Sequence, residues 1–297
     1  MAKLCEGKVA IVTGGGRGLG REYCLMLAAE GASVVVNDLG GATSGGGRDH
    51  RAAQEVVDEI IAGGGNAIAN GADVSDWEES REMIGMAVST YGKLDILINN
   101  AGILRDRMLV SMSEADWDEI MKVHLKGTFA PSHHAANHWR ERSKAEGCGV
   151  DGRLINTSSS SGLFGTVGQT NYGAAKAGIA AFTIVAAQEL LRYGVTVNAI
   201  APGAVTRLTS ELGTMSDELR AKLDPRNVAP IVVWLASEQS AEVTGRVFEV
   251  MAGRVTIAEG WTKGPSADVP GSPTEVGEFM PGLVAQSRPS GRPPLSA

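Results

Sequence analysis

The chain has 297 residues, of which 43% are hydrophobic and 21% charged, and its formal net charge is −7. This composition is typical of a globular protein and excludes a largely disordered chain. The acidic balance argues against nucleic acid or an anionic membrane surface as a partner, since both require a basic face. No apolar run approaches the roughly 20 residues that span a bilayer, so we expect no membrane partner.

Short β-branched runs alternate with helix-length amphipathic stretches along most of the chain. This alternation predicts βαβ units that close a parallel sheet buried on both faces. The predicted strands are Val9 to Thr13, Ser33 to Asp38, Ala67 to Asn70, Leu94 to Asn99, Arg153 to Thr157, Val195 to Ile200 and Val247 to Val250. The predicted helices are Gly18 to Glu30, Arg51 to Ala62, Asp76 to Tyr91, Trp117 to Arg142, Tyr172 to Arg192 and Val228 to Ala236.

The fold class that follows is α/β, a single doubly wound Rossmann domain with a seven-stranded parallel sheet. We place this domain at residues 1–262 and a Pro/Gly/Ser-rich, irregular tail at residues 263–297, where no periodic apolar pattern remains. The three cysteines are odd in number and widely spaced, which favours neither a disulfide framework nor a metal site. The N-terminus enters a strand pattern almost at once, so we expect a reducing, cytoplasmic location and no metal.

The first predicted strand runs into a glycine-rich turn, TGGGRGLG at residues 13–20, and then into a helix. Unpaired N–H groups at a helix N-terminus attract a pyrophosphate, and glycines allow its close approach. The pattern is informative here because it follows the first strand and because Asp38 ends the second. The residues expected to hold the pyrophosphate are Gly14, Arg17, Gly18, Leu19 and Gly20.

Asp38 indicates which dinucleotide binds. A carboxylate at this position accepts hydrogen bonds from the adenosine ribose hydroxyls and repels a 2′-phosphate, which favours NAD over NADP. The alternative is that Asp38 only caps the turn that follows it. Arg17 is the one residue of the glycine turn that argues for NADP, unless it is an exposed turn side chain.

Tyr172 and Lys176 open a long predicted helix and lie four residues apart, hence on the same face. A lysine cation near a phenol favours the phenolate and lowers the tyrosine pKa toward working pH, as acid/base work on an alcohol requires. The preceding strand ends in four serines, residues 158–161, at the edge where open α/β sheets bind ligands. One of these hydroxyls can hold a substrate oxygen against Tyr172, while the others simply end the strand.

These motifs, with NNAG at 99–102, YGAAK at 172–176 and APG at 201–203, resemble the short-chain dehydrogenase/reductase family over residues 7–252. The resemblance implies Ser159 as catalytic serine, Tyr172 as general acid/base, and Lys176 as the residue that binds the nicotinamide ribose. It also implies that Asp73 and Val74 contact adenine, that Asn100 lines the cofactor groove, and that the Val205 N–H meets the carboxamide.

One departure from the family pattern concerns His124. Many members carry an asparagine there that organises a proton relay through a water. A histidine can donate and accept, so either the relay persists or His124 is a packed helix residue.

Shorter strings resemble the (3R)-hydroxyacyl-CoA dehydrogenase domain of peroxisomal multifunctional enzymes type 2, or 17β-hydroxysteroid dehydrogenases type 4, and their bacterial stand-alone relatives. They are VVVNDLGG at 34–41, NNAGILRDR at 99–107, VHLKGTF at 123–129 and the ending GRVFEV…AEGW at 245–261. The resemblance implies NAD-linked oxidation of a (3R)-3-hydroxyacyl-CoA to the 3-ketoacyl-CoA in lipid or sterol side-chain degradation. It also implies a homodimer or homotetramer, joined through the helices Trp117 to Arg142 and Tyr172 to Arg192.

Substrate contacts are expected between Gly203 and Asn227, with Leu208, Leu212 and Met215 as an apolar wall. Arg105 and Arg107 either contact the CoA phosphates or are solvated charges. Three other functions remain open: oxidation of a hydroxysteroid of the 17β type, reduction of a 3-oxoacyl thioester, and non-catalytic NAD binding. The last would be expected to lose the acid/base residues, which are present here.

Overall fold

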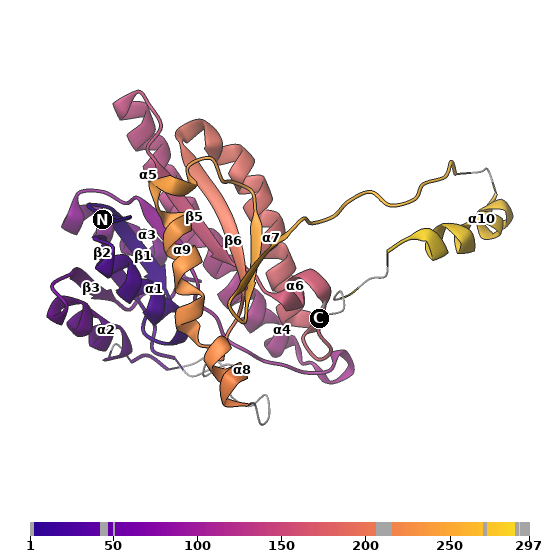
Figure 1. Ribbon diagram of the computed structural model, residues 1–297, viewed down its shortest axis with the longest axis horizontal. Helices are drawn as coiled ribbons and strands as arrows, with labels where there is room; N and C mark the ends of the chain where they lie inside the picture. Colours follow the sequence, from indigo (N-terminus) through magenta and orange to yellow (C-terminus); the bar gives the residue numbers. More distant parts are fainter. Residues whose placement is uncertain are drawn as a thin grey trace.

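The computed structural model describes residues 3–41, 47–49, 51–205, 216–269, 272–288 and 291. Within these ranges lies one eight-stranded sheet in the order β3-β2-β1-β4-β5-β6-β7-β8 (Figure 1). The strands are β1 (Val9–Thr13), β2 (Ser33–Asn37), β3 (Asn66–Asn70), β4 (Ile96–Asn99), β5 (Gly152–Thr157), β6 (Val195–Gly203), β7 (Val247–Met251) and β8 (Arg254–Ala258). The first seven pair in parallel, which confirms the doubly wound α/β fold.

The sheet has one strand more than the sequence analysis predicted. β8 pairs antiparallel with β7, placing Ile257 opposite Phe248. A tight turn at Ala252 and Gly253 joins the two, and both have positive φ, 50° and 79°. Hairpin turns of this kind are usually marked by Asn-Gly or Asp-Gly, so Ala-Gly gave no signal. β8 is also exposed along most of its length and has no buried face to produce an apolar alternation.

Helices cover both faces of the sheet (Figure 1). One face is covered by α1 (Gly18–Ala29), α2 (Arg51–Ala62) and α9 (Ala229–Ala236), and the other by α3 (Trp77–Tyr91), α5 (Gly127–Glu146) and α7 (Thr170–Leu190). Alternate residues of β1 enter the two cores, Ala10 and Val12 in the first, Val9 and Ile11 in the second. Because helices cover both faces of the sheet, polar groups that contact a ligand are expected at the ends of its strands.

The single helix expected from Trp117 to Arg142 is divided in three. It consists of α4 (Glu114–Ile120), a π-helical turn (Met121–Lys126) and α5. The helix starts earlier than predicted because Ser113 and Asp116 form a capping box. Pro131 inside α5 lacks the N–H that would bond the Gly127 carbonyl one turn back. The π-turn adds a residue to the preceding turn, and sequence periodicity does not signal such an insertion.

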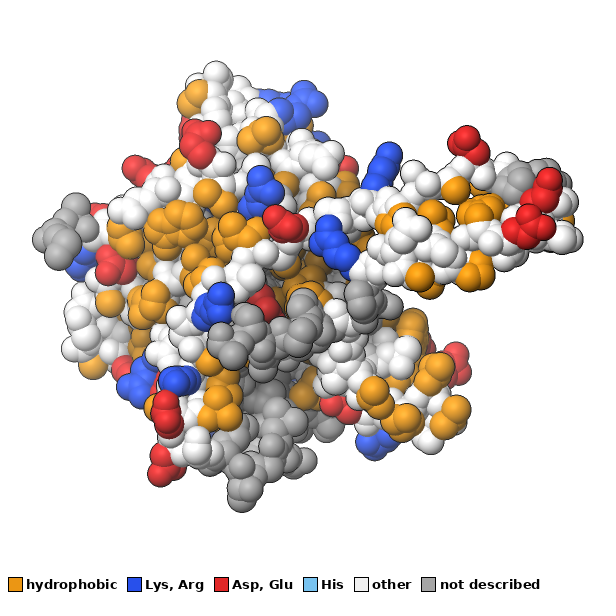
Figure 2. Space-filling view, turned by 45° about the vertical axis from the view of Figure 1, so that its right-hand side comes forward, with side chains coloured by type: hydrophobic (Ala, Val, Ile, Leu, Met, Phe, Trp, Pro, Cys, Tyr) orange, Lys and Arg blue, Asp and Glu red, His pale blue; other side chains and the backbone are white. Residues whose placement is uncertain are grey.

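The tail, expected to be irregular, contains a helix, α10 (Pro273–Gln286). Ser272 Oγ accepts from the Glu275 N–H, a Ser-x-x-Glu start signal that the sequence analysis did not use. Figures 1 and 2 show α10 standing away from the body, with hydrophobic side chains on its surface. The chain before and after α10 is joined by one contact, in which Arg288 Nη2 donates to Thr262 Oγ1 at 3.4 Å. The remaining α-helices of the described residues are α6 (Ser160–Phe164) and α8 (Asp217–Lys222).

One stretch of the described chain, α7 with the turn that follows it (Thr170–Tyr193), is long and apolar enough to cross a membrane. Core helices have the same length and composition. In the structure α7 packs against β5 and β6 and carries the buried polar residues Asn171 and Lys176. Its other side exposes Ile184 and Val185.

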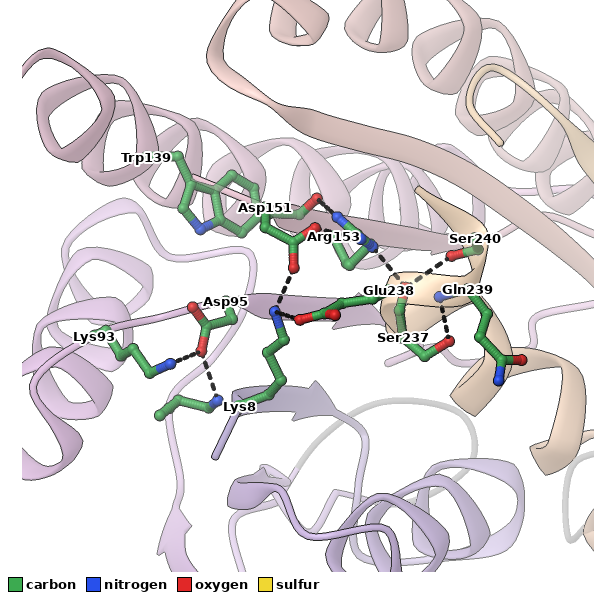
Figure 3. Close-up of polar contacts among 12 residues, drawn as sticks. Lys8, Lys93, Asp95, Trp139, Asp151, Arg153, Ser237, Glu238, Gln239 and Ser240 are labelled. Atoms are coloured by element: carbon green, nitrogen blue, oxygen red, sulfur yellow. Dashed lines mark hydrogen bonds and ion pairs between the residues drawn. The ribbon is translucent and has the colours of Figure 1, made fainter. Parts of the chain in front are cut away.

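Charged side chains are paired at the amino ends of β1, β4 and β5 (Figure 3). Asp151 contacts both Lys8 and the buried guanidinium of Arg153, while Lys8 also lies 3.5 Å from Glu238. Nearby, Asp95 accepts from the Val9 N–H at 2.9 Å and pairs with Lys93 and Arg142. This edge is therefore neutralised by direct ion pairs.

We expect Asp151→Asn to lower the free energy of unfolding at pH 7 by about 2 kcal/mol, because it leaves the Arg153 guanidinium buried without a counter-charge. Asparagine tolerates the φ of 51° at this position, so the change tests charge rather than backbone strain. Partial burial raises the pKa of Asp151, but the Lys8 hydrogen bond and the Arg153 charge outweigh it and hold that pKa below its ordinary value.

A lowered folded-state pKa means that Asp151 stabilises the fold above the unfolded carboxyl pKa, and that this contribution disappears as pH falls. The difference between wild type and variant should therefore shrink below about pH 4. Urea unfolding at several pH values measures it, with exposed Asp118→Asn as the matched control. An equal loss of stability in both variants would contradict the ion-pair explanation.

Candidate functional site

A cavity of about 580 Å³ opens at the carboxyl edge of the sheet, where β1, β2, β4 and β5 end. Its wall brings together most of the predicted site residues, namely Gly14, Arg17, Gly18, Leu19, Asp38, Asp73, Val74, Asn100, Tyr172 and Lys176. Segments far apart in the sequence therefore meet at one site. Ser159, Gly20 and Val205 do not belong to the wall.

The glycine turn is held by the segment that follows β4. Asn100 Nδ2 donates to the carbonyl oxygens of Thr13 and Gly14, at 2.9 and 3.2 Å. Gly14 has a φ of +62°, and a Cβ there would lie 2.9 Å from the Ala101 Cα. Asn100 thus lines the cavity as predicted, but its amide is occupied in fixing the turn.

The N-terminus of α1 faces this cavity. Arg17 occupies the N-cap position and gives no side-chain hydrogen bond to the first turn, so the N–H groups beyond it remain for an anion. Close packing requires glycine at position 20, since a Cβ there would collide with the Gly14 carbonyl. A turn that only glycines fit, at an uncapped helix N-terminus, suits a pyrophosphate.

Asp38 fixes the loop on both of its sides. Its Oδ2 accepts from the Gly16 N–H at 2.9 Å, and its Oδ1 accepts from the Gly40 N–H at 2.7 Å. The capping role set out as the alternative is therefore present. Each carboxylate oxygen can accept more than one hydrogen bond, so ribose hydroxyls still fit at a side chain that lines the cavity.

Asp73 and Val74 lie further along the same wall. Asp73 Oδ1 accepts from the N–H and the hydroxyl of Ser75, at 2.9 and 2.6 Å. Val74 is buried and packs against Gly127, where a Cβ would lie 2.8 Å from its Cγ2. The pair thus offers a rigid, partly apolar wall.

The three predicted catalytic residues are close together. Lys176 Nζ lies 5.6 Å from the centre of the Tyr172 ring and donates to the Thr157 carbonyl at 2.6 Å. Ser159 acts on the Tyr172 side chain by lowering its pKa, and its own Oγ accepts from the Ser161 N–H at 3.2 Å as the N-cap of α6. Ser159 thus reaches the site through Tyr172 although it does not line the cavity.

The pKa of Tyr172 differs from the expectation. Burial raises it, the Ser159 hydrogen bond lowers it, and the Asp106 charge raises it, so the net change is upward. Burial also lowers the pKa of Lys176 to about 7. Burial therefore favours the neutral forms of both groups. The predicted lowering by Lys176 is therefore not met by these side chains alone.

Val205 also differs from its predicted role. Its N–H donates to the Leu223 carbonyl at 2.8 Å, because Val205 lies beside the C-terminal end of α8. Pro202 and Ala204 form the cavity wall instead. The predicted apolar wall of Leu208, Leu212 and Met215 lies outside the described residues.

Both arginines proposed for CoA phosphates have polar partners within the chain. Arg105 lies 3.6 Å from Asp116, in an ion pair. Arg107 is exposed, and its guanidinium donates to the Asp106 carbonyl at 2.9 Å.

Two amide side chains were missed by the sequence analysis. Asn171 Oδ1 accepts from the Tyr172 N–H at 2.8 Å, and its Nδ2 donates to the carbonyls of Arg105 and Asp116. Gln169 Nε2 donates to Asp106 Oδ2 at 2.7 Å, and its Oε1 accepts from Ser161. They tie the start of α7 to the loop after β4. An amide directly before Tyr172 at a helix start was the available signal.

Comparisons with known proteins agree with this geometry. A family model described as short chain dehydrogenase matches residues 8–217. The chain is 47% identical over 261 residues to hydroxyacyl-CoA dehydrogenase ChsB1 of Mycobacterium tuberculosis, covering 85% of this chain and 80% of that protein. It is 45% identical over 251 residues to peroxisomal multifunctional enzyme type 2 of Drosophila melanogaster, covering 84% of this chain but only 40% of that protein. The crystal structure of a short chain dehydrogenase from Mycobacterium avium has a TM-score of 0.87 at 50% identity, covering 97% of this chain and 98% of the other.

Asp106→Asn should lower the pKa of Tyr172, because it removes a charge that raises that pKa and keeps an oxygen for Gln169. Since Asp106 is exposed and screened, we expect the pH of half-maximal alcohol oxidation to fall by about half a unit. The measurement is the pH profile of turnover, with Asp106→Glu as the charge-conserving control. A midpoint that stays or moves upward in Asp106→Asn would contradict the assigned effect.

Proposed function

Since this chain belongs to the short-chain dehydrogenase family, we propose that it oxidises a (3R)-3-hydroxyacyl-CoA to the 3-ketoacyl-CoA with NAD. The oxidoreductase class follows from the family. The observation that carries the proposal is the half-buried Tyr172, with Ser159 lowering its pKa and Lys176 beside it, in the wall of the cavity that begins at the glycine turn.

The substrate class is supported by two relatives. One is named a hydroxyacyl-CoA dehydrogenase and the other a peroxisomal multifunctional enzyme type 2. Shared identity above 40% over most of this chain favours a related substrate. Degradation of lipids or sterol side chains is the corresponding physiological role that we propose.

The residues present fit a dinucleotide. The glycine turn and the α1 N-terminus would hold the pyrophosphate, Asp38 the adenosine ribose, Asp73 and Val74 the adenine, and Lys176 the nicotinamide ribose. The Asp38 carboxylate disfavours a 2′-phosphate, which supports NAD as the cofactor. When bound, NAD supplies an acceptor for the hydride that leaves carbon 3 of the substrate.

The side chains of this chain handle the proton. The ionised Tyr172 oxygen takes the proton of the substrate hydroxyl as the C–H electron pair leaves and the C=O bond forms. The Ser159 hydroxyl holds the substrate oxygen at this position. Asn171 keeps the first turn of α7, and hence Tyr172, in place. The same groups return the proton when the reaction runs backward.

The assembly and the location remain proposals. Exposed apolar side chains on α5 and α7, among them Phe129, Ile184 and Val185, favour a homodimer or homotetramer. The three cysteines are free, two of them buried, as suits a reducing cytoplasm.

The function is tested by measuring NADH production with (3R)-3-hydroxyacyl-CoA esters of increasing chain length, with the (3S) esters as the stereochemical control. We expect turnover of the (3R) esters only. Tyr172→Phe should lower kcat at least about 10³-fold and leave NAD binding intact, since it removes the acid/base group. Absence of turnover with every (3R) ester, or faster NADPH-driven reduction of a 3-oxoacyl thioester, would rule the proposal out.

Cofactor choice is tested at Asp38. Asp38→Asn removes the charge and leaves one acceptor oxygen for the two N–H groups of the loop, so kcat/KM for NADP relative to NAD should rise about tenfold. Asp58→Asn, an exposed carboxylate on neighbouring α2, is the matched control. An unchanged ratio would mean that Asp38 serves only to cap the loop.

A further inference from the structure

Arg48 is a cation in the cavity wall to which the proposed mechanism gives no role. It lies between β2 and α2, and its side chain is 52% exposed. It nevertheless lines the cavity, together with Leu39 and Gly47 of the same connection. Asp73 and Val74, the residues proposed to hold the adenine, line the same cavity. The position of the guanidinium relative to these two residues therefore decides what it can contact.

Glu79, in the first turn of α3, joins Arg48 to the adenine side of the cavity. Its Oε1 accepts from Arg48 Nη2 at 2.7 Å, and its Oε2 accepts from the Asp73 N–H at 2.7 Å. Because one carboxylate makes both contacts, the guanidinium is held close to the backbone of Asp73. Arg48 therefore lies at the adenine end of the cavity, remote in the chain from the residues that handle the proton.

The carboxylate that holds Arg48 is itself fixed. Glu79 begins α3 together with the N-cap residue Asp76, whose Oδ1 accepts from the Glu79 N–H at 2.9 Å. The hydrogen bond from Arg48 and the one from the Asp73 N–H outweigh burial and hold the pKa of Glu79 below its ordinary value. Glu79 is thus an anion at working pH, attached to a capped helix start.

The segment that carries Arg48 is fixed as well. The Asp49 N–H donates to the Leu39 carbonyl at 3.0 Å. Gly40 has a φ of +75°, and a Cβ there would collide with the Asp49 carbonyl oxygen. Asp38, proposed to hold the adenosine ribose, accepts from the Gly40 N–H at 2.7 Å. Backbone contacts therefore connect Arg48 to the residue that would bind the neighbouring part of the same ligand.

The ion pair between Arg48 and Glu79 contributes little to stability, because both side chains reach the solvent and water screens their charges. Its effect is to hold a flexible side chain in one place. A guanidinium is planar and stacks on aromatic rings, which an ammonium does not do in the same way. Adenine offers such a ring. A fixed guanidinium at this end of the cavity therefore suits the base of a dinucleotide.

We infer that Arg48 is a cofactor-binding residue whose guanidinium stacks on the adenine ring, and that Glu79 is the positioning residue that holds it there. The inference rests on the proposed use of a dinucleotide. The base would then contact a guanidinium as well as the apolar side chain of Val74. Because Glu79 neutralises the guanidinium, Arg48 does not offer a free cation to a 2′-phosphate, which agrees with the proposed choice of NAD.

The first test measures binding of ADP-ribose, which has the adenosine and the pyrophosphate but no nicotinamide, to the full chain by calorimetry. Arg48→Gln should weaken binding about fivefold. Arg48→Lys keeps the charge but not the planar group, and it should weaken binding by a similar factor. Arg81→Gln removes the arginine of the exposed Arg81–Glu78 pair on α3 and is the matched control, with unchanged binding expected. Wild-type affinity in either Arg48 variant would overturn the inference.

The second test separates the positioning role of Glu79 from a direct one. A glutamine at this position has one acceptor oxygen for two donors, Arg48 and the Asp73 N–H, so Glu79→Gln should weaken ADP-ribose binding about threefold. If Glu79 acts through Arg48, the double variant with Arg48→Gln binds no more weakly than Arg48→Gln alone. Losses that add in the double variant would overturn the positioning role.

Both tests need neither substrate nor turnover, so their failure is distinct from failure of the proposed function. Inorganic pyrophosphate, which lacks the base, should bind equally to wild type and Arg48→Lys. Thermal unfolding without ligand should be unchanged in the variants, since both side chains are partly exposed. A wild-type chain that binds NADH and ADP-ribose no better than the Arg48 variants do would remove this role and leave the dehydrogenase proposal standing. Absence of binding in wild type would overturn both.

Discussion

A lysine ammonium buried without a carboxylate is the constraint on which the site depends. Lys176 is 3% exposed, and among the described residues no acidic side chain pairs with it. Water has to be replaced by neutral acceptors, of which the Thr157 carbonyl at the end of β5 is one. The same burial that lowers the lysine pKa raises that of the neighbouring phenol, so both groups are pushed toward their neutral forms. Chemistry at Tyr172 requires that this tendency be opposed.

Polar side chains are paired with one another at the amino edge of the sheet, whereas some of those at its carboxyl edge are not. At the amino edge, Lys8, Arg153 and Asp151 neutralise one another directly, and this edge contributes to stability (Figure 3). At the carboxyl edge, His124 Nδ1 and Thr157 Oγ1 remain unpaired in the described residues. Unpaired buried groups cost stability, and natural proteins tolerate them mainly where they serve a ligand or a reaction.

The sequence was informative wherever one local pattern determined the structure. The central parallel strands are rich in buried apolar residues because both faces are covered, and the turn at Gly14 needs glycine for a positive φ and close packing. β8 was missed because its mostly exposed strand and its Ala-Gly turn lack such a pattern. The π-turn at Met121–Lys126 was missed because an inserted residue leaves no periodic trace.

The site could be predicted as a set of residues but not as a set of interactions. Spacing placed Tyr172 and Lys176 on one helix face, yet their pKa values depend on burial by distant segments. Likewise, no sequence pattern indicates that the Val205 N–H donates to the Leu223 carbonyl. None indicates that the Asp38 carboxylate accepts from the N–H groups of Gly16 and Gly40. These contacts join residues whose separation in the chain is set by the fold as a whole.

Neutral acceptors around Lys176 have an advantage over a carboxylate. A carboxylate would hold the lysine charged, but its negative charge would oppose the phenolate, as Asp106 already does from a greater exposure to solvent. A neutral acceptor such as the Thr157 carbonyl stabilises the cation without that penalty. The ionisation of Tyr172 and Lys176 then belongs to the pair, so a change at either residue or at its acceptors shifts the pH response of both.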